Sequence, residues 1–177
     1  NLPSGELKVS SGYALGKPLK SQIGLLVEGA ANHAERVVIA EKNTSGEYVE
    51  LTYGEAYKLA QAVAAQLMRL GGSQETPLMI LSGASRAHFV ISWGAILAGV
   101  PYVPVSANYS TVDAAFGKLK AVFERTQPRF VWSENYSAQE QALTATGLID
   151  SKVVWLGSSS VVESTPVATE ATPAAVQ

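Results

Sequence analysis

The stretch LSGASRAHFVISWGAILAGVPYVPVS, residues 81–106, decides the fold of this chain. The run PLMIL at 77–81 ends at the first residue of this stretch. It is short and wholly apolar, as expected of a strand in the middle of a parallel sheet. A small polar turn follows, then a helix, and then VPYVPVS at 100–106 as the next strand. This order of strand, turn, helix and strand predicts one β-α-β unit.

The polar turn at residues 82–85 is the first candidate site. Ligands of open α/β sheets gather at the carboxyl ends of strands and beside helix amino termini. Ser82, Gly83 and Arg86 are therefore candidate contacts for a phosphate or carboxylate. In the alternative interpretation Ser85 caps the helix, Gly83 makes the bend, and Arg86 and His88 face water. The chain has no G-x-G-x-x-G and no G-x-x-x-x-G-K-[ST] run, so a dinucleotide or Walker-type site has no support.

A second polar group follows the strand at residues 100–106. Ser106, Asn108 and Tyr109 come after its carboxyl end, which makes them candidate contacts at the rim of a substrate site. Alternatively, these residues form a polar loop, and Ser110 caps the next helix.

The helix after Ser85 is apolar around most of its circumference. A helix of this kind is buried on all sides, so one face is expected on the sheet and the other against a second layer. Either neighbouring helices of this chain supply that layer, or part of it lies outside the chain, which would favour self-association of the chain alone. The apolar positions are Phe89, Val90, Ile91, Trp93, Ile96 and Leu97.

The segments before this unit predict a short strand within residues 5–19, a helix ending near His33, and a β-hairpin. The hairpin runs are RVVIAEK at 36–42 and EYVELTY at 47–53, joined by the turn residues NTSG. Residues 51–72 form the clearest helix, with Thr52 and Glu55 as a capping box and Gly71 and Gly72 as its end. Its predicted apolar stripe comprises Ala56, Leu59, Ala60, Val63, Ala64 and Leu67.

The segments after the unit continue the alternation of helix and strand. Ser110 and Asp113 can cap a helix that ends before Pro128, and RFVW at 129–132 is the next strand. A helix at 137–147 and a strand at 152–156 follow. This alternation predicts an α/β fold with a doubly wound, mostly parallel sheet and helices on both faces, preceded by a helix and a β-hairpin.

We expect residues 1–156 to form this α/β unit and residues 157–177 to form a linker or frayed end. The last segment, GSSSVVESTPVATEATPAAVQ, is rich in Ser, Thr, Pro and Ala and has few large apolar groups. A chain that stops within a linker is expected to be part of a longer protein.

Composition excludes several classes of function. The chain has 177 residues and no cysteine, which excludes disulfides, thiolate catalysis and zinc–thiolate sites. Its formal net charge of -2 and lack of a basic block argue against nucleic acid and anionic membrane surfaces as partners. No apolar run is long enough to span a membrane, so a cytoplasmic protein is expected. With two Asp and two His, the chain predicts no catalytic residue and no metal site of its own.

Two further stretches resemble a known family. LTYGEAYKLAQAVAAQLMRLG at 51–71 is similar to the opening signature of the adenylate-forming superfamily, the AMP-binding acyl-CoA synthetases and their relatives. WGAILAGVPYVPVSANYS at 93–110 resembles the second signature of the same family, at the matching distance. The resemblance spans roughly residues 20–156, and the run from Ile80 to Pro128 looks most like feruloyl-CoA synthetases and other aryl-acid CoA ligases. Ala84 and Ala107 depart from the residues that the family often has, Asn and Pro.

The resemblance implies the amino-terminal subdomain of an ATP-dependent acid–CoA ligase. Such an enzyme uses ATP, Mg²⁺ and coenzyme A, adenylates a small aryl carboxylate, and transfers the acyl group to the coenzyme A thiol. The family's TSG-x-TG-x-PKG phosphate loop is not in the chain, and neither is the carboxy-terminal lysine that the family uses. The resemblance therefore implies that the chain is inactive alone and that its partner is the remainder of its own chain.

Two alternatives from other classes remain open at this stage. The chain could be a stand-alone α/β binding or interaction module with the apolar helix as its partner surface. It could also be a nucleotide-binding domain of oxidoreductase type, although the missing glycine fingerprint weighs against that function.

Overall fold

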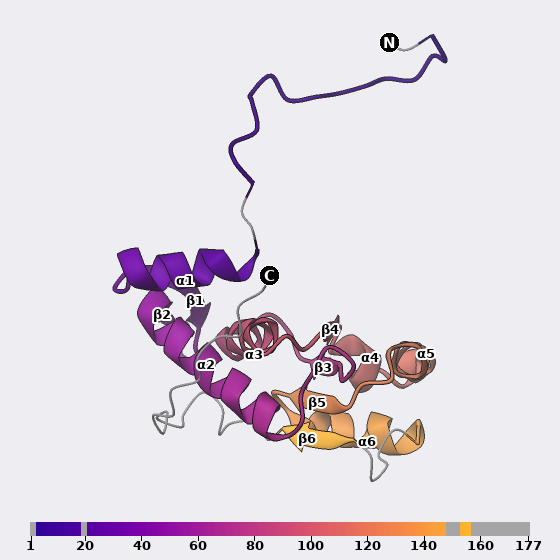
Figure 1. Ribbon diagram of the computed structural model, residues 1–177. Coiled ribbons are helices and arrows are strands. Elements are labelled where there is room, and N and C mark those ends of the chain that lie inside the picture. Colours follow the sequence, from indigo (N-terminus) through magenta and orange to yellow (C-terminus); the bar gives the residue numbers. More distant parts are fainter. Residues whose placement is uncertain (1–2, 19–20, 148–152, 157–177) are drawn as a thin grey trace.

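The molecule is built on a four-stranded parallel sheet, in a computed structural model that describes residues 3–18, 21–147 and 153–156. Its strands are β3 (Leu78–Leu81), β4 (Tyr102–Val105), β5 (Phe130–Ser133) and β6 (Val154–Leu156). They lie in the order β4-β3-β5-β6, and every pair is parallel (Figure 1). Leu78 of β3 is in register with Tyr102 on one side and Phe130 on the other. The predicted parallel sheet is confirmed.

Helices cover both faces of this sheet, as predicted. On one face lie α2 (Tyr53–Arg69) and α3 (Arg86–Leu97), and on the other α5 (Phe116–Thr126) and α6 (Tyr136–Ala145). The strand side chains alternate between the two sides, because successive residues of a strand point to opposite faces. Leu78 and Ile80 belong to the core that includes α2 and α3, whereas Met79 and Leu81 pack with α5 and α6.

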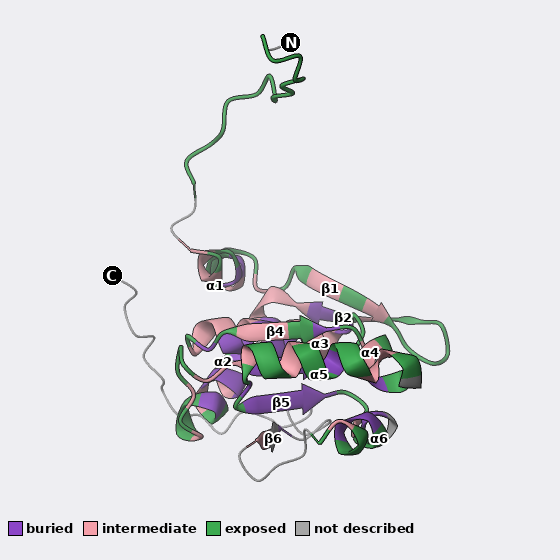
Figure 2. Ribbon diagram, turned by 90° about the vertical axis from the view of Figure 1, so that its right-hand side faces the viewer, coloured by how far each residue is buried: buried purple, intermediate pink, exposed green. Residues whose placement is uncertain are grey.

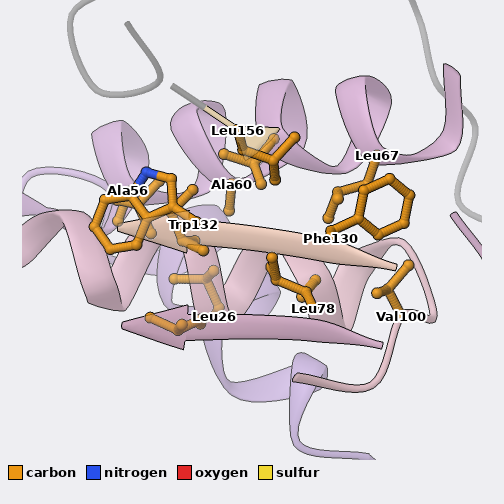
Figure 3. Packing of buried hydrophobic residues seen from close by; sticks show 14 of the residues in the cluster. Leu26, Ala56, Ala60, Leu67, Leu78, Val100, Phe130, Trp132 and Leu156 are labelled. Atoms are coloured by element: carbon orange, nitrogen blue, oxygen red, sulfur yellow. The ribbon is translucent and has the colours of Figure 1, made fainter. Parts of the chain in front are cut away.

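The larger core lies between the sheet and α2. Phe130 and Trp132 of β5 point from the sheet toward α2 and are fully buried (Figure 3). Burial of one such aromatic side chain contributes about 1.5–3 kcal/mol. The α2 residues that meet this side of the sheet include Ala56, Ala60 and Leu67, three members of the apolar stripe predicted from the sequence.

Helix α1 (Ile23–Asn32) and a hairpin precede the sheet. Strands β1 (Val37–Lys42) and β2 (Tyr48–Thr52) pair antiparallel and form a sheet of their own, separate from the parallel one. The side chain of Asn43 fixes the turn, since its Oδ1 accepts the N–H groups of Ser45 and Glu47, each at 3.0 Å. The helix and the hairpin are both confirmed.

Helix α2 begins and ends as the sequence predicts. The Thr52 hydroxyl accepts the N–H of Glu55, and the Glu55 carboxylate accepts the N–H of Thr52 at 2.9 Å, which completes the capping box. The Thr52 hydroxyl also donates to the Glu55 carboxylate at 3.0 Å, and the hydrogen bonds from the Thr52 N–H and hydroxyl lower the pKa of the Glu55 carboxyl. Beyond the other end, Gly71 has a φ of +82°, the left-handed conformation that ends many helices.

Helices α2 and α3 pack closely where Gly94 faces Val63. A Cβ added at Gly94 would lie 2.4 Å from the Val63 Cβ and Cγ1, so only glycine permits this approach. Helix α2 and the sheet of this chain therefore cover much of the surface of α3. Phe89, Trp93, Ile96 and Leu97 nevertheless stay half-buried, so the helix is not enclosed on all sides.

The amino-terminal strand predicted within residues 5–19 is wrong. Residues 3–18 contain no strand and are exposed throughout, with Leu15 98% exposed (Figure 2). A strand requires a partner for its backbone hydrogen bonds, and no described segment pairs with this one. The predicted linker at residues 157–177 lies outside the described residues.

The predicted start of the helix after residue 110 is also wrong. Ser110 lies within the short helix α4 (Asn108–Thr111), and its hydroxyl donates to the Ala107 carbonyl at 2.9 Å instead of capping α5. A 3₁₀ turn at Asp113–Ala115 follows, and α5 begins at Phe116 without a side-chain cap. The serine hydroxyl is used locally, since short polar side chains readily bond nearby backbone groups.

Candidate functional site

A cavity of about 880 Å³ lies at the carboxyl ends of β3 and β4, between the hairpin and the first half of α3. This is the edge of a parallel sheet at which ligands usually bind. The wall comes from the β1 residues 39–42, the turn residues 82–85, the segment 104–108, and His88, Phe89, Ser92, Trp93 and Tyr102.

Four of the six site residues predicted from the sequence meet in this cavity. Ser82 and Gly83 line it from the turn after β3, and Ser106 and Asn108 from the segment after β4. The two other predicted residues do not line it. Arg86 contacts the hairpin, and the ring of Tyr109 lies under the Lys118 ammonium, whose Nζ is 5.6 Å from the ring centroid. Contact of any of these residues with a ligand stays a prediction.

Ser85 caps α3, as the structural interpretation of the turn predicts. Its extended backbone places the hydroxyl where it accepts the N–H of His88 at 3.1 Å. The side chain is buried, and it holds the turn between β3 and α3 in one conformation.

The carboxylate of Glu41, from the hairpin, contacts the first turn of α3. Glu41 Oε2 accepts the N–H of Arg86 at 2.9 Å and lies 3.5 Å from the Arg86 Nε. A negative charge is favourable here because the amino terminus of a helix carries a partial positive charge and free N–H groups. The contact joins residues 45 apart in sequence, so no local signal could reveal it. The anion that Arg86 meets in this structure is thus a side chain of its own protein.

His88 is half-exposed, and one nitrogen of its ring is bound by the turn. Its Nδ1 lies 3.0 Å from the Gly83 carbonyl and 2.9 Å from the Ser82 Oγ. A carbonyl oxygen only accepts, so Nδ1 carries a proton that it donates to the Gly83 carbonyl. Nε2 has no hydrogen-bond partner within residues 3–18, 21–147 and 153–156. His88 stays half-exposed, so the expectation that it meets water is incomplete because one ring nitrogen is bound by the turn.

Ser82 and His88 do not form a nucleophile and its base. The Ser82 hydroxyl donates to the Gly83 carbonyl at 2.9 Å, and the protonated Nδ1 of His88 cannot take a proton from it. The arrangement therefore positions groups around a cavity and offers no activated nucleophile.

Three further residues of α3 line the cavity: Phe89, Ser92 and Trp93. Phe89 and Trp93 form a tilted ring pair with centroids 5.8 Å apart. Ser92 follows His88 by one helical turn and is 8% exposed, and its hydroxyl has no hydrogen-bond partner among the described residues. Lys42, from β1, also lines the cavity, and its ammonium lies 5.3 Å from the Tyr48 ring centroid.

Metal and membrane sites do not appear in the described part of the chain. Its His, Asp and Glu residues form no group of three that could hold a metal ion. Among its helices, none combines the length and apolarity that crossing a bilayer requires.

Solved structures of adenylate-forming enzymes share this fold. A fatty acyl-adenylate ligase from L. pneumophila, in complex with acyl adenylate and pyrophosphate, matches with a TM-score of 0.65 and 16% identity, over 78% of this chain and 23% of its own. McyG A-PCP, complexed with phenylalanyl-adenylate, matches with a TM-score of 0.68 and 17% identity, over 88% of this chain and 25% of its own. The NpsA N-terminal subdomain of Klebsiella oxytoca, in complex with 3-hydroxyanthranilyl-AMSN, matches with a TM-score of 0.64 and 17% identity. The match covers 88% of this chain and 34% of its own.

The chain spans about a quarter to a third of the length of these structures. None of the curated protein sequences matches it significantly. Its sequence matches the family described as AMP-binding enzyme over residues 26–177, which is most of the chain. The protein belongs to the AMP-binding enzyme family.

Proposed function

We propose that this chain is the amino-terminal part of an ATP-dependent ligase that joins an aryl carboxylic acid to coenzyme A, in the manner of feruloyl-CoA synthetases. The family match over residues 26–177 is the observation that supports adenylate formation. The choice of an aryl acid and of coenzyme A rests on the resemblance of residues 80–128 to feruloyl-CoA synthetases.

The proposed reaction has two steps. A carboxylate oxygen of the acid attacks the α-phosphorus of ATP, and the bond to the pyrophosphate leaving group breaks. The acyl-adenylate has an electrophilic carbonyl carbon, which the sulfur of coenzyme A attacks; AMP leaves, and the thiol proton passes to water. Cationic groups and Mg²⁺ would offset the charge on the phosphates, and the described residues include no group of three His, Asp or Glu that could hold a metal ion.

This chain would contribute structure and part of a rim to that reaction. Its sheet and helices hold the turn after β3 and the segment after β4 in fixed positions around the cavity. Ser82, Gly83, Ser106 and Asn108 would contact substrate or cofactor from there. Under this proposal the phosphate loop and the catalytic lysine come from the remainder of the same polypeptide, which acts in the cytoplasm.

The test compares the 177-residue chain with the protein that its gene encodes as a whole. Each is incubated with ATP, Mg²⁺, coenzyme A and one acid from a panel of ferulate, benzoate, a fatty acid and an amino acid. Mass spectrometry follows the acyl-adenylate and the thioester, and a separate assay follows pyrophosphate. We expect feruloyl-CoA, AMP and pyrophosphate in equal amounts from the complete protein and none from the 177-residue chain.

Each other outcome rejects a stated part of the proposal. Adenylation of a fatty or amino acid in preference to ferulate would reject the aryl-acid specificity. Acyl-adenylate without thioester would reject coenzyme A as the acceptor. Turnover by the 177-residue chain would show that no further part of the polypeptide is needed.

A further inference from the structure

Residues 5–17 form an exposed segment whose large apolar side chains all stand at odd positions (Figure 2). The even positions of the segment carry only charged, polar or small side chains. Because successive side chains of an extended chain point to opposite sides, the large apolar ones form a single row. A lone exposed apolar residue is ordinary, whereas a contiguous apolar surface marks an interaction site. Each member of the row is at least 74% exposed: Leu7, Val9, Tyr13 and Leu15.

The backbone of this segment is open to a partner strand. No described strand pairs with it, and the hydrogen bonds described for its backbone include only that from the Tyr13 N–H to the Ser11 hydroxyl, at 3.1 Å. The segment lies between Pro3 and Pro18 and contains no proline, so each of its residues offers both an N–H and a C=O group. An exposed strand of this kind binds through main-chain hydrogen bonds, and its side-chain row decides which partner fits.

The row is complementary to itself in one antiparallel register. When two copies of the segment pair about Ser11, Leu7 of each copy lies opposite Leu15 of the other. Val9 of each copy lies opposite Tyr13 of the other in the same way. Directly opposite residues of an antiparallel pair share one face, so the two rows form one apolar face. The arrangement has two-fold symmetry and closes after two copies.

Other registers of two copies are less favourable. A parallel pair in register sets Lys8 against Lys8 of the other copy, and like charges directly opposite each other are destabilising. A shift of the antiparallel register by two residues sets either Val9 against Ser11 or Leu7 against Lys17. Only the register centred on Ser11 therefore opposes all four apolar side chains with apolar ones.

A hairpin within one chain would form the same side-chain pairs, with residues 10–12 as its loop. A three-residue hairpin loop usually contains a residue in the left-handed conformation. Gly12 is the residue of this loop best suited to that conformation. None of the three has a positive φ, although Gly5 nearby has a φ of +82°. The backbone of the segment is thus not arranged for a hairpin.

Helix α1 offers cover for the apolar face of such a pair. Two strands alone are only marginally stable in water, so their apolar face needs a surface to pack on. Leu25 and Val27 of α1 are 50% and 38% exposed, and α1 follows the segment after a short connection, residues 18–22. That connection is long enough for the segment to fold back over the helix.

We propose that residues 5–17 are a dimerisation strand of this protein. The segment pairs antiparallel with the same segment of a second copy about a two-fold axis at Ser11, and the apolar face of the pair lies on α1. In the single chain the segment has no partner, which is the reason that it forms no strand there. This interaction is separate from the cavity and from the proposed reaction.

Introduced thiols test the register directly, since the chain has no cysteine of its own. In Ser11→Cys the two thiols face each other across the axis, at a Cα separation of about 4.5–5.5 Å, which a disulfide can bridge. Ser10→Cys is the matched control, because Ser10 is an exposed neighbour in the same segment. In the proposed register its two thiols are offset by two residues, at a Cα separation of about 8 Å, which is too long for a disulfide.

The 177-residue chains are oxidised in a glutathione buffer, and non-reducing electrophoresis follows the disulfide-linked dimer. We expect Ser11→Cys to cross-link about tenfold faster than Ser10→Cys or more, because pairing raises the effective concentration of its thiols. Sedimentation velocity of the wild-type chain, from micromolar to millimolar concentration, should show a reversible equilibrium of monomer and dimer.

Charged replacements test the apolar row. Val9→Lys places an ammonium opposite Tyr13 of the other copy, and Tyr13→Glu places a carboxylate opposite Val9. Each variant alone should shift the equilibrium toward monomer, and an equimolar mixture should recover dimer, because the two new charges then face each other. Ser10→Lys adds the same charge outside the row and should leave the dimer unchanged. Circular dichroism should show all these chains equally folded, since the replaced side chains are exposed.

Several results would overturn the proposal. A wild-type chain that stays monomeric at millimolar concentration would reject it, whether the segment remains extended or forms a hairpin. Equal cross-linking rates of the two cysteine variants would reject the register. A dimer that Val9→Lys leaves intact would place the contact elsewhere, for example on the half-buried side of α3. None of these measurements requires ligand or turnover, so their failure leaves the proposed function standing.

Discussion

Glu41 in the hairpin and Arg86 in the first turn of α3 are joined by two contacts to one carboxylate oxygen. Oε2 accepts the Arg86 N–H at 2.9 Å and lies 3.5 Å from its Nε. The Arg86 Nε has no hydrogen-bond partner within the described segments, so this carboxylate provides its charge compensation. The pair fixes the hairpin against α3 along one wall of the cavity.

Replacement of Glu41 by alanine should loosen the hairpin. The side chains of Arg86 and Glu41 are 28% and 36% exposed, so solvent screens the ion pair and the backbone hydrogen bond dominates. We expect Glu41→Ala to lower the free energy of unfolding by about 0.5–1.5 kcal/mol in urea titrations. Glu124→Ala is the control, since its pair with Lys120 is more exposed and spans 3.9 Å. An equal effect of both replacements would contradict the importance of the Arg86 contact.

Gly94→Ala should separate α2 from α3. The new Cβ would lie 2.4 Å from Val63 and 3.0 Å from the Ala60 carbonyl, so the helices must move apart. We expect a loss of about 1–3 kcal/mol in the free energy of unfolding, as for other overpacked cores. Gly117→Ala in α5 is the matched replacement, because a Cβ there meets nothing within 4 Å. Alanine is the better helix former, so Gly117→Ala should leave stability unchanged or raise it. A Gly94→Ala protein as stable as wild type would disprove the close contact.

Protonation of Glu55 should weaken the start of α2. Its folded pKa is lowered, chiefly by the hydrogen bond from the Thr52 backbone and then by that from the Thr52 hydroxyl. A group with a depressed folded pKa stabilises the protein above its unfolded pKa, about 4.3 for glutamate, and the effect is lost as the pH falls through the lower folded value. The melting temperature of wild type should therefore fall more steeply below about pH 5 than that of Glu55→Gln. Parallel curves for the two proteins would exclude this contribution.

Gln139→Leu should disrupt a buried polar network between α6 and the sheet. The Gln139 amide donates to the Leu81 carbonyl at 2.9 Å and accepts from the Ser133 hydroxyl. The Leu81 carbonyl would lose this donor, and the Ser133 hydroxyl would lose its acceptor while it still accepts the N–H of Asn135 at 3.2 Å; losing such buried hydrogen bonds costs about 1–3 kcal/mol. Urea unfolding should show this loss, whereas Glu140→Ala, at the exposed neighbouring position, should change stability little. A larger loss of stability in Glu140→Ala than in Gln139→Leu would exclude the network.

Much of the fold could be predicted from the sequence because its signals are local. The capping box at Thr52 and Glu55 and the glycine at position 71 mark the ends of α2 through their own backbone requirements. The apolar run at 78–81 predicts a strand buried on both faces, and the regular alternation with helices predicts parallel strands. Predictions from local sequence signals failed where the structure of a segment depends on which other residues it contacts. Residues 3–18 have no strand to pair with, and the Ser110 hydroxyl bonds to Ala107 instead of to α5.

The candidate site was only partly predictable for the same reason. The sequence placed Ser82, Gly83, Ser106 and Asn108 at strand ends, and the sheet then brought them to one cavity because β3 and β4 are parallel neighbours. It could not reveal that Glu41 reaches Arg86, which no spacing rule connects. Nor could it show that the Gly83 carbonyl fixes the His88 ring.

By itself the sequence determined most of the helices and strands, though not the structure of residues 3–18 or 108–115, since capping, turn chemistry and periodicity act over a few residues. The tertiary structure alone decided the strand order β4-β3-β5-β6 and the contacts of the hairpin with α3. Those depend on which buried surfaces fit together and which polar groups find partners across the fold, and both are properties of residues far apart in the chain.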